Sequence, residues 1–155
     1  MNTGNHKRSP AAPADGADLR ALGLETMLSV AAPGRRPGAA TPLPPDSPDA
    51  ALIEIGHVSV WAMLWAREGL GRRERSLVTL GILIALGAEA ELASHVRIAL
   101  NNGLTKPEIT EVICHAAGYA GFPRSMAAAK VARQTLDDLP DATPPAKEAR
   151  TQGDS

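Results

Sequence analysis

The fold is decided by two adjoining stretches, RRERSLVTLGILIALG at residues 72–87 and EAELASHVRIALN at residues 89–101. After its charged start, the first stretch is apolar on nearly every side of a helical wheel. This pattern predicts a helix that is central or buried between subunits. In the second stretch Leu92, Val96 and Ala99 recur at the spacing of one helix face. The pair therefore predicts neighbouring helices in an aliphatic core.

Helical signals continue on both sides of these stretches. Asp49 can cap a helix that runs to about residue 66. Residues 105–108, Thr-Lys-Pro-Glu, form a capping box with proline in the first turn, and they open a helix to about residue 120. The break Gly-Phe-Pro at residues 121–123 starts a last helix to about Leu136. Since no alternating strand pattern of useful length occurs, the predicted fold class is all-α.

Proline placement predicts the domain organisation. Eight of the thirteen prolines precede residue 50 and three lie within residues 140–145. We therefore expect a largely disordered Pro/Ala/Gly-rich segment at residues 1–48, with a possible short helix at 18–30 that docks on the body. The helical domain spans residues 49–139, and residues 140–155 form a flexible tail.

Composition limits the function classes. The 155 residues fit one domain, and with 44% apolar but 3% aromatic residues the core is built from aliphatic side chains. A net charge of −1 gives no case for nucleic acid or an anionic membrane as partner. The longest apolar run, Leu77–Ala88, is too short to span a bilayer, and no secretory signal is evident. A cytoplasmic protein is expected.

The single cysteine, Cys114, excludes an intrachain disulfide. Its apolar flanks predict a buried thiol.

Glu91 precedes His95 by one helical turn, and Glu111 precedes His115 in the same way. A carboxylate in that position can orient an imidazole and favour its protonated form, which is a proton donor near neutral pH. The spacing fits an exposed surface pair equally, and Tyr119 fits packing. Neither pair has HExxH spacing or an evident third ligand, so no metal site is predicted.

Arginines and tryptophans flank the apolar stretch. Arg73 and Arg75 can hold a substrate carboxylate by charge-assisted contacts, although a solvated helix start is an equal interpretation. Trp61 and Trp65 lie one turn apart, and core packing is the favoured interpretation of both.

The run from residue 61 to residue 123 resembles the carboxymuconolactone decarboxylase family. The matching positions are Trp61, Trp65, Gly69-Leu70, Arg73, Arg75-Ser76-Leu77, Glu91, His95, Asn101-Asn102-Gly103, Glu108-Ile109, Glu111, Tyr119, Gly121 and Pro123. The resemblance implies an alkylhydroperoxidase D-like helical bundle, assembled as a trimer or hexamer with sites near subunit contacts. It also implies a lyase that decarboxylates 4-carboxymuconolactone without a cofactor, in aromatic degradation.

The peroxidase branch of that superfamily carries a Cys-x-x-Cys pair followed by a histidine. With that histidine placed on His95, Ala88 and Glu91 stand where the cysteines would be. A dithiol mechanism needs two thiols, so thiol peroxidase activity is not expected.

The resemblance assigns roles to seven residues that are expected to share one concavity. His95 is the proton donor and Glu91 orients it, while Arg75, helped by Arg73, holds a carboxylate. His115, Tyr119 and Trp65 complete the pocket for a small carboxylate or lactone. Two alternatives stay open. One is an isomerase, cyclase or hydrolase that acts on another small acid, and the other is a non-enzymatic helical oligomer that binds a ligand or partner.

Overall fold

The computed structural model describes residues 16–33, 44 and 47–139, and within these ranges every regular element is helical. The elements in chain order are α1 (Gly16–Ala31), α2 (Pro48–Gly56), the π-helix η1 (His57–Trp65), α3 (Arg72–Leu86), α4 (Glu89–Asn101), α5 (Lys106–Ala120) and α6 (Phe122–Asp137). The all-α prediction is confirmed. No helix in these ranges is both long and apolar enough to cross a membrane.

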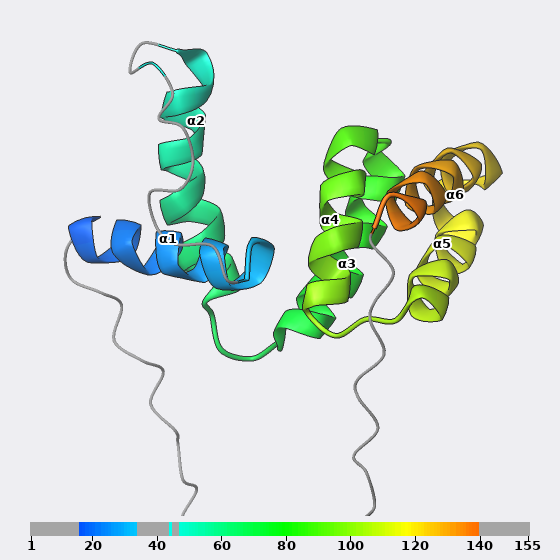
Figure 1. Ribbon diagram of the computed structural model, residues 1–155, viewed down its shortest axis with the longest axis horizontal. Helices are drawn as coiled ribbons and strands as arrows, with labels where there is room; N and C mark the ends of the chain where they lie inside the picture. The colour runs from blue at the N-terminus through cyan, green and yellow to red at the C-terminus, as the bar shows by residue number, and fades with distance from the viewer. Residues whose placement is uncertain (1–15, 34–43, 45–46, 140–155) are drawn as a thin grey trace, which may run out of the picture.

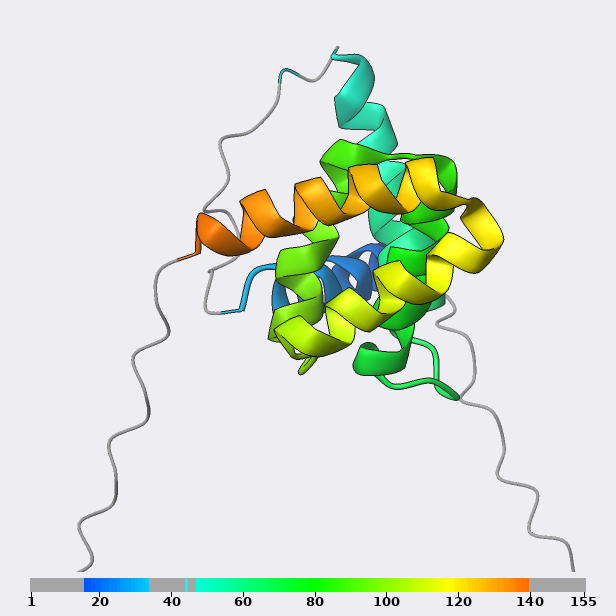
Figure 2. The ribbon, with the colours of Figure 1, turned by 90° about the vertical axis from the view of Figure 1, so that its right-hand side faces the viewer.

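Helices α3 to α6 form the bundle on the right of Figure 1, and Figure 2 shows it from the side of α5 and α6. Helix α3 packs against both α4 and α5, whereas α4 and α5 contact each other much less. The core is aliphatic, as the composition predicts. Its buried members are Leu80, Ile84, Leu92, Val96, Ala99, Leu104, Ile109, Ile113, Ala116, Ala128 and Ala132.

Helices α1, α2 and η1 form a second group, on the left of Figure 1, in which α1 crosses η1. The crossing is close because α1 has a glycine there. A Cβ atom at Gly23 would lie 1.8 Å from the carbonyl oxygen of His57. The group meets the bundle through a buried cluster of Val30, Trp65 and Ile98, which belong to α1, η1 and α4.

Most helix ends follow the sequence signals. The side chain of Thr105 accepts from the backbone N–H of Glu108, whose carboxylate accepts from the N–H of Thr105, so the predicted capping box is present. The helix that was expected to start at Asp49 begins one residue earlier, with Ser47 as N-cap and Pro48 in the first turn. Asp49 as the cap is therefore wrong. The same segment changes to π-helical geometry at His57, which no sequence pattern indicated.

Expectations about the N-terminal helix, the cysteine and helix α3 have different outcomes. The predicted helix at 18–30 is present in α1 and docks on η1 and α4, while the expected disorder of the remaining N-terminal segment and of residues 140–155 lies outside the described residues. The buried thiol is wrong, because Cys114 is exposed on α5. Helix α3 buries Leu80 and Ile84 but leaves its opposite side exposed, since one chain covers only one side of it.

Candidate functional site

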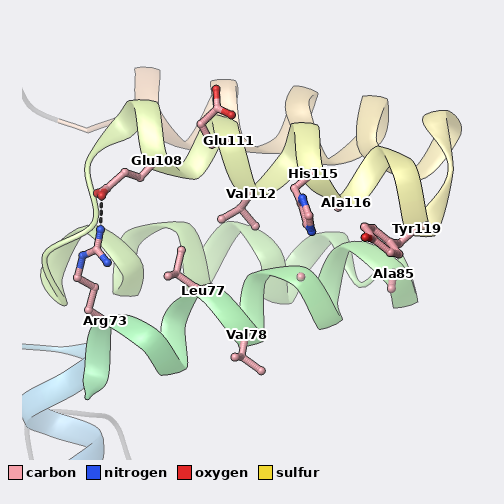
Figure 3. Close-up of a pocket in the computed structure, with 12 residues that line it drawn as sticks. Arg73, Leu77, Val78, Ala85, Glu108, Glu111, Val112, His115, Ala116 and Tyr119 are labelled. Carbon is pink, nitrogen blue, oxygen red and sulfur yellow. Dashed lines mark hydrogen bonds and ion pairs between the residues drawn. The ribbon is translucent and has the colours of Figure 1, made fainter. Parts of the chain in front are cut away.

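Helices α3 and α5 flank a groove of about 710 Å³ (Figure 3). Its lining is mostly apolar, with the Arg73–Glu108 pair at one end and Tyr119 at the other. The apolar lining consists of Leu77, Val78, Gly81, Ala85, Val112, Ala116 and Ala120, and the polar lining consists of Arg73, Glu108, Glu111, His115 and Tyr119. The groove is therefore suited to a ligand with an apolar body and polar ends.

An ion pair between Arg73 and Glu108 lies at one end of this groove (Figure 3). The Glu108 carboxylate also accepts from the backbone N–H of Thr105 at 2.9 Å and from its hydroxyl at 3.0 Å. These hydrogen bonds to Thr105, with the nearby Arg73 guanidinium, lower the pKa of Glu108 below its ordinary value. Arg73 lines this groove, but the Glu108 carboxylate already balances its charge.

Two aromatic rings lie at the other end. The rings of His115 and Tyr119, one turn apart on α5, have centroids 5.0 Å apart at an interplanar angle of 38°. In Figure 3 His115 points from α5 toward α3, whereas Glu111 points away. No ion pair or hydrogen bond joins Glu111 to His115 within the described ranges. The predicted role of Glu111 in orienting His115 therefore has no contact behind it in this chain.

His95 lies apart from this groove, against η1. Its imidazole stacks on the Trp65 indole, with ring centroids 6.3 Å apart and an interplanar angle of 26°. Its Nδ1 atom is buried and has no hydrogen-bond partner in the part of the chain that the structure describes. An unpartnered buried imidazole nitrogen is uncommon in proteins, which marks His95 as a candidate functional residue.

Burial decides the charge state of His95. It lowers the pKa of the imidazole below its ordinary value of 6.5, and the opposing effect of the Glu91 carboxylate is smaller. Glu91 itself is exposed and forms no hydrogen bond with His95 among the described residues. Glu91 therefore favours the imidazolium form, as expected, but burial has the larger effect and the net shift of the His95 pKa is downward.

Arg75 is held near the same end of η1. Its Nη2 atom donates to the carbonyl oxygen of Arg67 at 2.7 Å, while its Nε atom is buried and has no partner within the described residues. Arg67 follows Trp65 by two positions, so the segment that stacks on His95 also anchors Arg75. In contrast to Arg73, Arg75 forms no ion pair in the described part of the chain.

The seven predicted residues thus fall into two groups. Arg73, His115 and Tyr119 line the groove between α3 and α5, whereas His95, Glu91, Arg75 and Trp65 are not part of its lining. The expected single concavity is not formed by this groove. The physical reason is that α3 stands between α4 and α5, so the polar faces of these two helices do not meet within one chain.

Two contributions were missed at the sequence level. Glu108 was read only as a cap, although it is also the partner of Arg73. Val30 of α1 was assigned no role, yet it is buried against Trp65. Both are contacts between distant segments, which helical periodicity does not encode. No group of three or more His, Cys, Asp or Glu residues suited to a metal occurs in the described ranges.

Comparison with known proteins identifies the family of the helical bundle. Residues 59–134 match the carboxymuconolactone decarboxylase family. This segment belongs to that family. It spans most of η1 and helices α3 to α5, with most of α6, so both groups of candidate residues lie inside the family domain.

Two named relatives match over a length similar to that of the family match. The chain is 49% identical over 79 residues to a 4-carboxymuconolactone decarboxylase of Acinetobacter baylyi, which covers 51% of this chain and 59% of that protein. It is 46% identical over 81 residues to a nitrosuccinic acid decarboxylase of Metarhizium robertsii, covering 52% and 57%. The chain thus spans less than two thirds of these relatives. Helix α1 precedes the family domain.

Proposed function

We propose that this protein is a cofactor-independent decarboxylase that acts on a small carboxylated lactone such as 4-carboxymuconolactone. The support from relatives is that the two proteins described above are both named decarboxylases. Their substrates share a chemical property. In each, the carboxylate that leaves as carbon dioxide can pass its electron pair toward an acceptor, an unsaturated lactone in one and a nitro group in the other.

The observation that carries the proposal is the environment of His95. The imidazole is half-buried in the family domain, stacks on Trp65 and keeps a buried Nδ1 atom without a partner among the described residues. A proton-transfer group needs restricted motion and a free ring nitrogen. Arg75, whose Nε atom is also buried and unpartnered there, supplies a cationic group anchored near the same end of η1.

The proposed reaction uses these groups as follows. The bond between the ring carbon and the carboxylate breaks, and carbon dioxide leaves. The electron pair delocalises through the double bond onto the lactone carbonyl, so the substrate is its own electron sink and no cofactor is required. Arg75 holds a carboxylate, and His95 delivers a proton to the distal carbon of the dienolate. Donors placed at the developing oxyanion can contribute roughly 3–4 kcal/mol each.

The lowered pKa of His95 fits this role once substrate is considered. In the free protein the imidazole is neutral near pH 7, because burial disfavours its charged form. A bound carboxylate beside it is an opposite charge, which favours the imidazolium form. Substrate binding would then raise the pKa of His95, and the imidazole would take up the proton that it later donates. Glu91 assists electrostatically in this proposal, and His115, Tyr119 and Trp65 remain proposed pocket residues.

We also propose that the protein works as a homo-oligomer, a trimer or hexamer. The exposed side of α3 carries Val78, Ile82 and Leu86 at intervals of four residues, with 53%, 53% and 67% of their surface exposed in the single chain. This stripe adjoins the apolar groove, since Val78 also lines it. A partner subunit on this side would bury the stripe and could bring further groups to the pocket.

The direct test measures carbon dioxide release from 4-carboxymuconolactone and, in parallel, from nitrosuccinic acid, with the Acinetobacter baylyi relative as active control. We expect release from the lactone and a loss of about 100-fold or more in kcat for His95→Gln, since general acid catalysis contributes on that scale. Glu89→Gln, in the exposed first turn of the same helix, is the matched control. Full activity of His95→Gln would remove the proposed proton donor, and no turnover of the lactone would remove that substrate.

The same protein preparation can be tested for thiol peroxidase activity, the chemistry of the Cys-x-x-Cys branch of the superfamily. The chain has one cysteine, Cys114, and a dithiol peroxidase needs an attacking and a resolving thiol. We therefore expect no thiol-dependent consumption of hydroperoxide.

A further inference from the structure

We propose that helix α1, which lies outside the family domain, is a structural wall of the His95 site, and that Val30 and Trp65 are positioning residues that fix the imidazole. The proposal rests on the proposed function for its catalytic consequence, but the placement of His95 can be measured without turnover.

The first step is the contact with the imidazole itself. Trp65 stacks on His95 at a centroid separation of 6.3 Å and is only 8% exposed. The indole therefore restricts the imidazole on one side and removes water from it. The neighbouring Trp61 packs on Trp65 with centroids 5.6 Å apart, so the indole has a second aromatic contact. Trp65 acts on the reaction through His95 in this arrangement.

The second step is what holds the indole. Val30, at the C-terminal end of α1, is fully buried and packs with Trp65 and with Ile98 of α4. Ile98 follows His95 on the same helix. Val30 therefore closes the side of the cluster that η1 and α4 leave open, and its removal would let the indole move or admit water.

The third step is that α1 is fastened at several points along its length. Arg72, in the first turn of α3, donates to the hydroxyl of Ser29 at 2.9 Å, next to Val30. Gly23 permits close approach to η1 at the middle of α1. Near the start of α1, Arg20 donates to Glu54 of α2 at 2.7 Å and forms an ion pair with it. These contacts join α1 to α2, η1 and α3, so α1 is a fixed part of the site.

The charged groups around His95 decide how a change in its titration is interpreted. Glu91, on the same helix, is the charged group that opposes the effect of burial on the pKa of His95. The contacts that η1 and α1 bring to this cluster, Trp65 and Val30, are uncharged. A change in the titration of His95 after a change at Val30 therefore reports burial, because no charge has been added or removed.

The experiment follows the His95 titration by NMR in the full chain, with the imidazole resonance identified from the His95→Gln spectrum. In Val30→Ala we expect the midpoint to move upward toward the ordinary value, because water reaches the ring. Leu22→Ala, an exposed position on the same helix, should leave the midpoint where it is. A folded Val30→Ala protein with an unchanged midpoint would overturn the proposal.

Kinetics separate positioning from substrate binding. We expect Val30→Ala to lower kcat by about tenfold with little change in KM, as misplacement of a catalytic group does. Should Val30→Ala fail to fold, a second pair of variants tests the contact of Trp65 with His95, on which the proposed role of Val30 depends. Trp65→Phe, which keeps a ring against His95, should retain more activity and a lower midpoint than Trp65→Leu. Equal behaviour of these two variants would overturn the proposal. If the wild-type chain turns over no lactone, the NMR titration alone decides whether α1 positions His95.

Discussion

Arg73 and Glu108 form an ion pair across the groove between α3 and α5, although they are 35 positions apart in the chain. Since Glu108 also caps α5 through Thr105, one carboxylate both stabilises the start of a helix and balances the charge of Arg73 in the groove lining. A substrate carboxylate at Arg73 would compete with Glu108 for the guanidinium. Arg75 is free of this competition, which favours it as the main carboxylate contact.

Glu108→Gln separates the role of Glu108 as a helix cap from its role as the ion-pair partner of Arg73. Glutamine can still serve in a capping box, but it cannot neutralise Arg73. We expect little loss of stability, because the pair is partly exposed to solvent, and a lower Kd for a dicarboxylate inhibitor. Calorimetric titration and urea unfolding measure both. Glu111→Gln, which removes a charge from the same helix without breaking an ion pair, is the control. Weaker binding in Glu108→Gln would contradict this competition for Arg73.

The burial of His95 predicts how stability depends on pH. Its pKa is lower in the folded protein than the ordinary value of 6.5, so the unfolded chain binds more protons as the pH falls below that value. The stability is therefore full above about pH 6.5 and declines as the pH drops toward the lowered folded value. Urea unfolding of the wild type and of His95→Gln between pH 7.5 and 5.5 measures the difference. A steeper decline in the variant would show that the sign is wrong.

Gly23→Ala should destabilise the protein, in contrast to the usual effect of this change in a helix. Alanine normally stabilises a helix interior by roughly 0.5–1 kcal/mol relative to glycine. At Gly23 the added Cβ atom would overlap the carbonyl oxygen of His57, so α1 must shift, and overpacking of this kind costs about 1–3 kcal/mol. Gly118→Ala on α5 should instead stabilise the protein, because the added Cβ atom would have no atom of another segment within 4 Å. Thermal unfolding of both variants measures the contrast, and a rise in Tm for Gly23→Ala would rule out the close approach.

The apolar stripe on α3 predicts the effect of a charge at its centre. Ile82→Glu should leave the single chain folded, because this side chain is more than half exposed, but it should break the proposed oligomer. Light scattering after size-exclusion chromatography gives the mass, and circular dichroism gives the helix content. Leu70→Glu, an exposed leucine in the connection before α3, is the matched control and should assemble as the wild type does. Assembly of Ile82→Glu to the wild-type mass would place the interface elsewhere.

Local signals were sufficient for most of the helices. The glycine at residue 87, the capping box at Thr105 and the break at Gly121 each act through the backbone within one or two turns, and the structure has helix ends at all three. Periodicity also identified the buried face of α4 through Leu92, Val96 and Ala99, because the face of a helix follows from residue spacing alone.

The sequence by itself thus determined the all-α fold of the described residues and the identities of the candidate residues. Only the tertiary structure decided which of them lie together, that Arg73 is paired, that His95 has a lowered pKa, and that Val30 packs behind Trp65. The reason is physical. Helix formation depends on neighbours within four residues, whereas burial and charge depend on segments brought together from far along the chain.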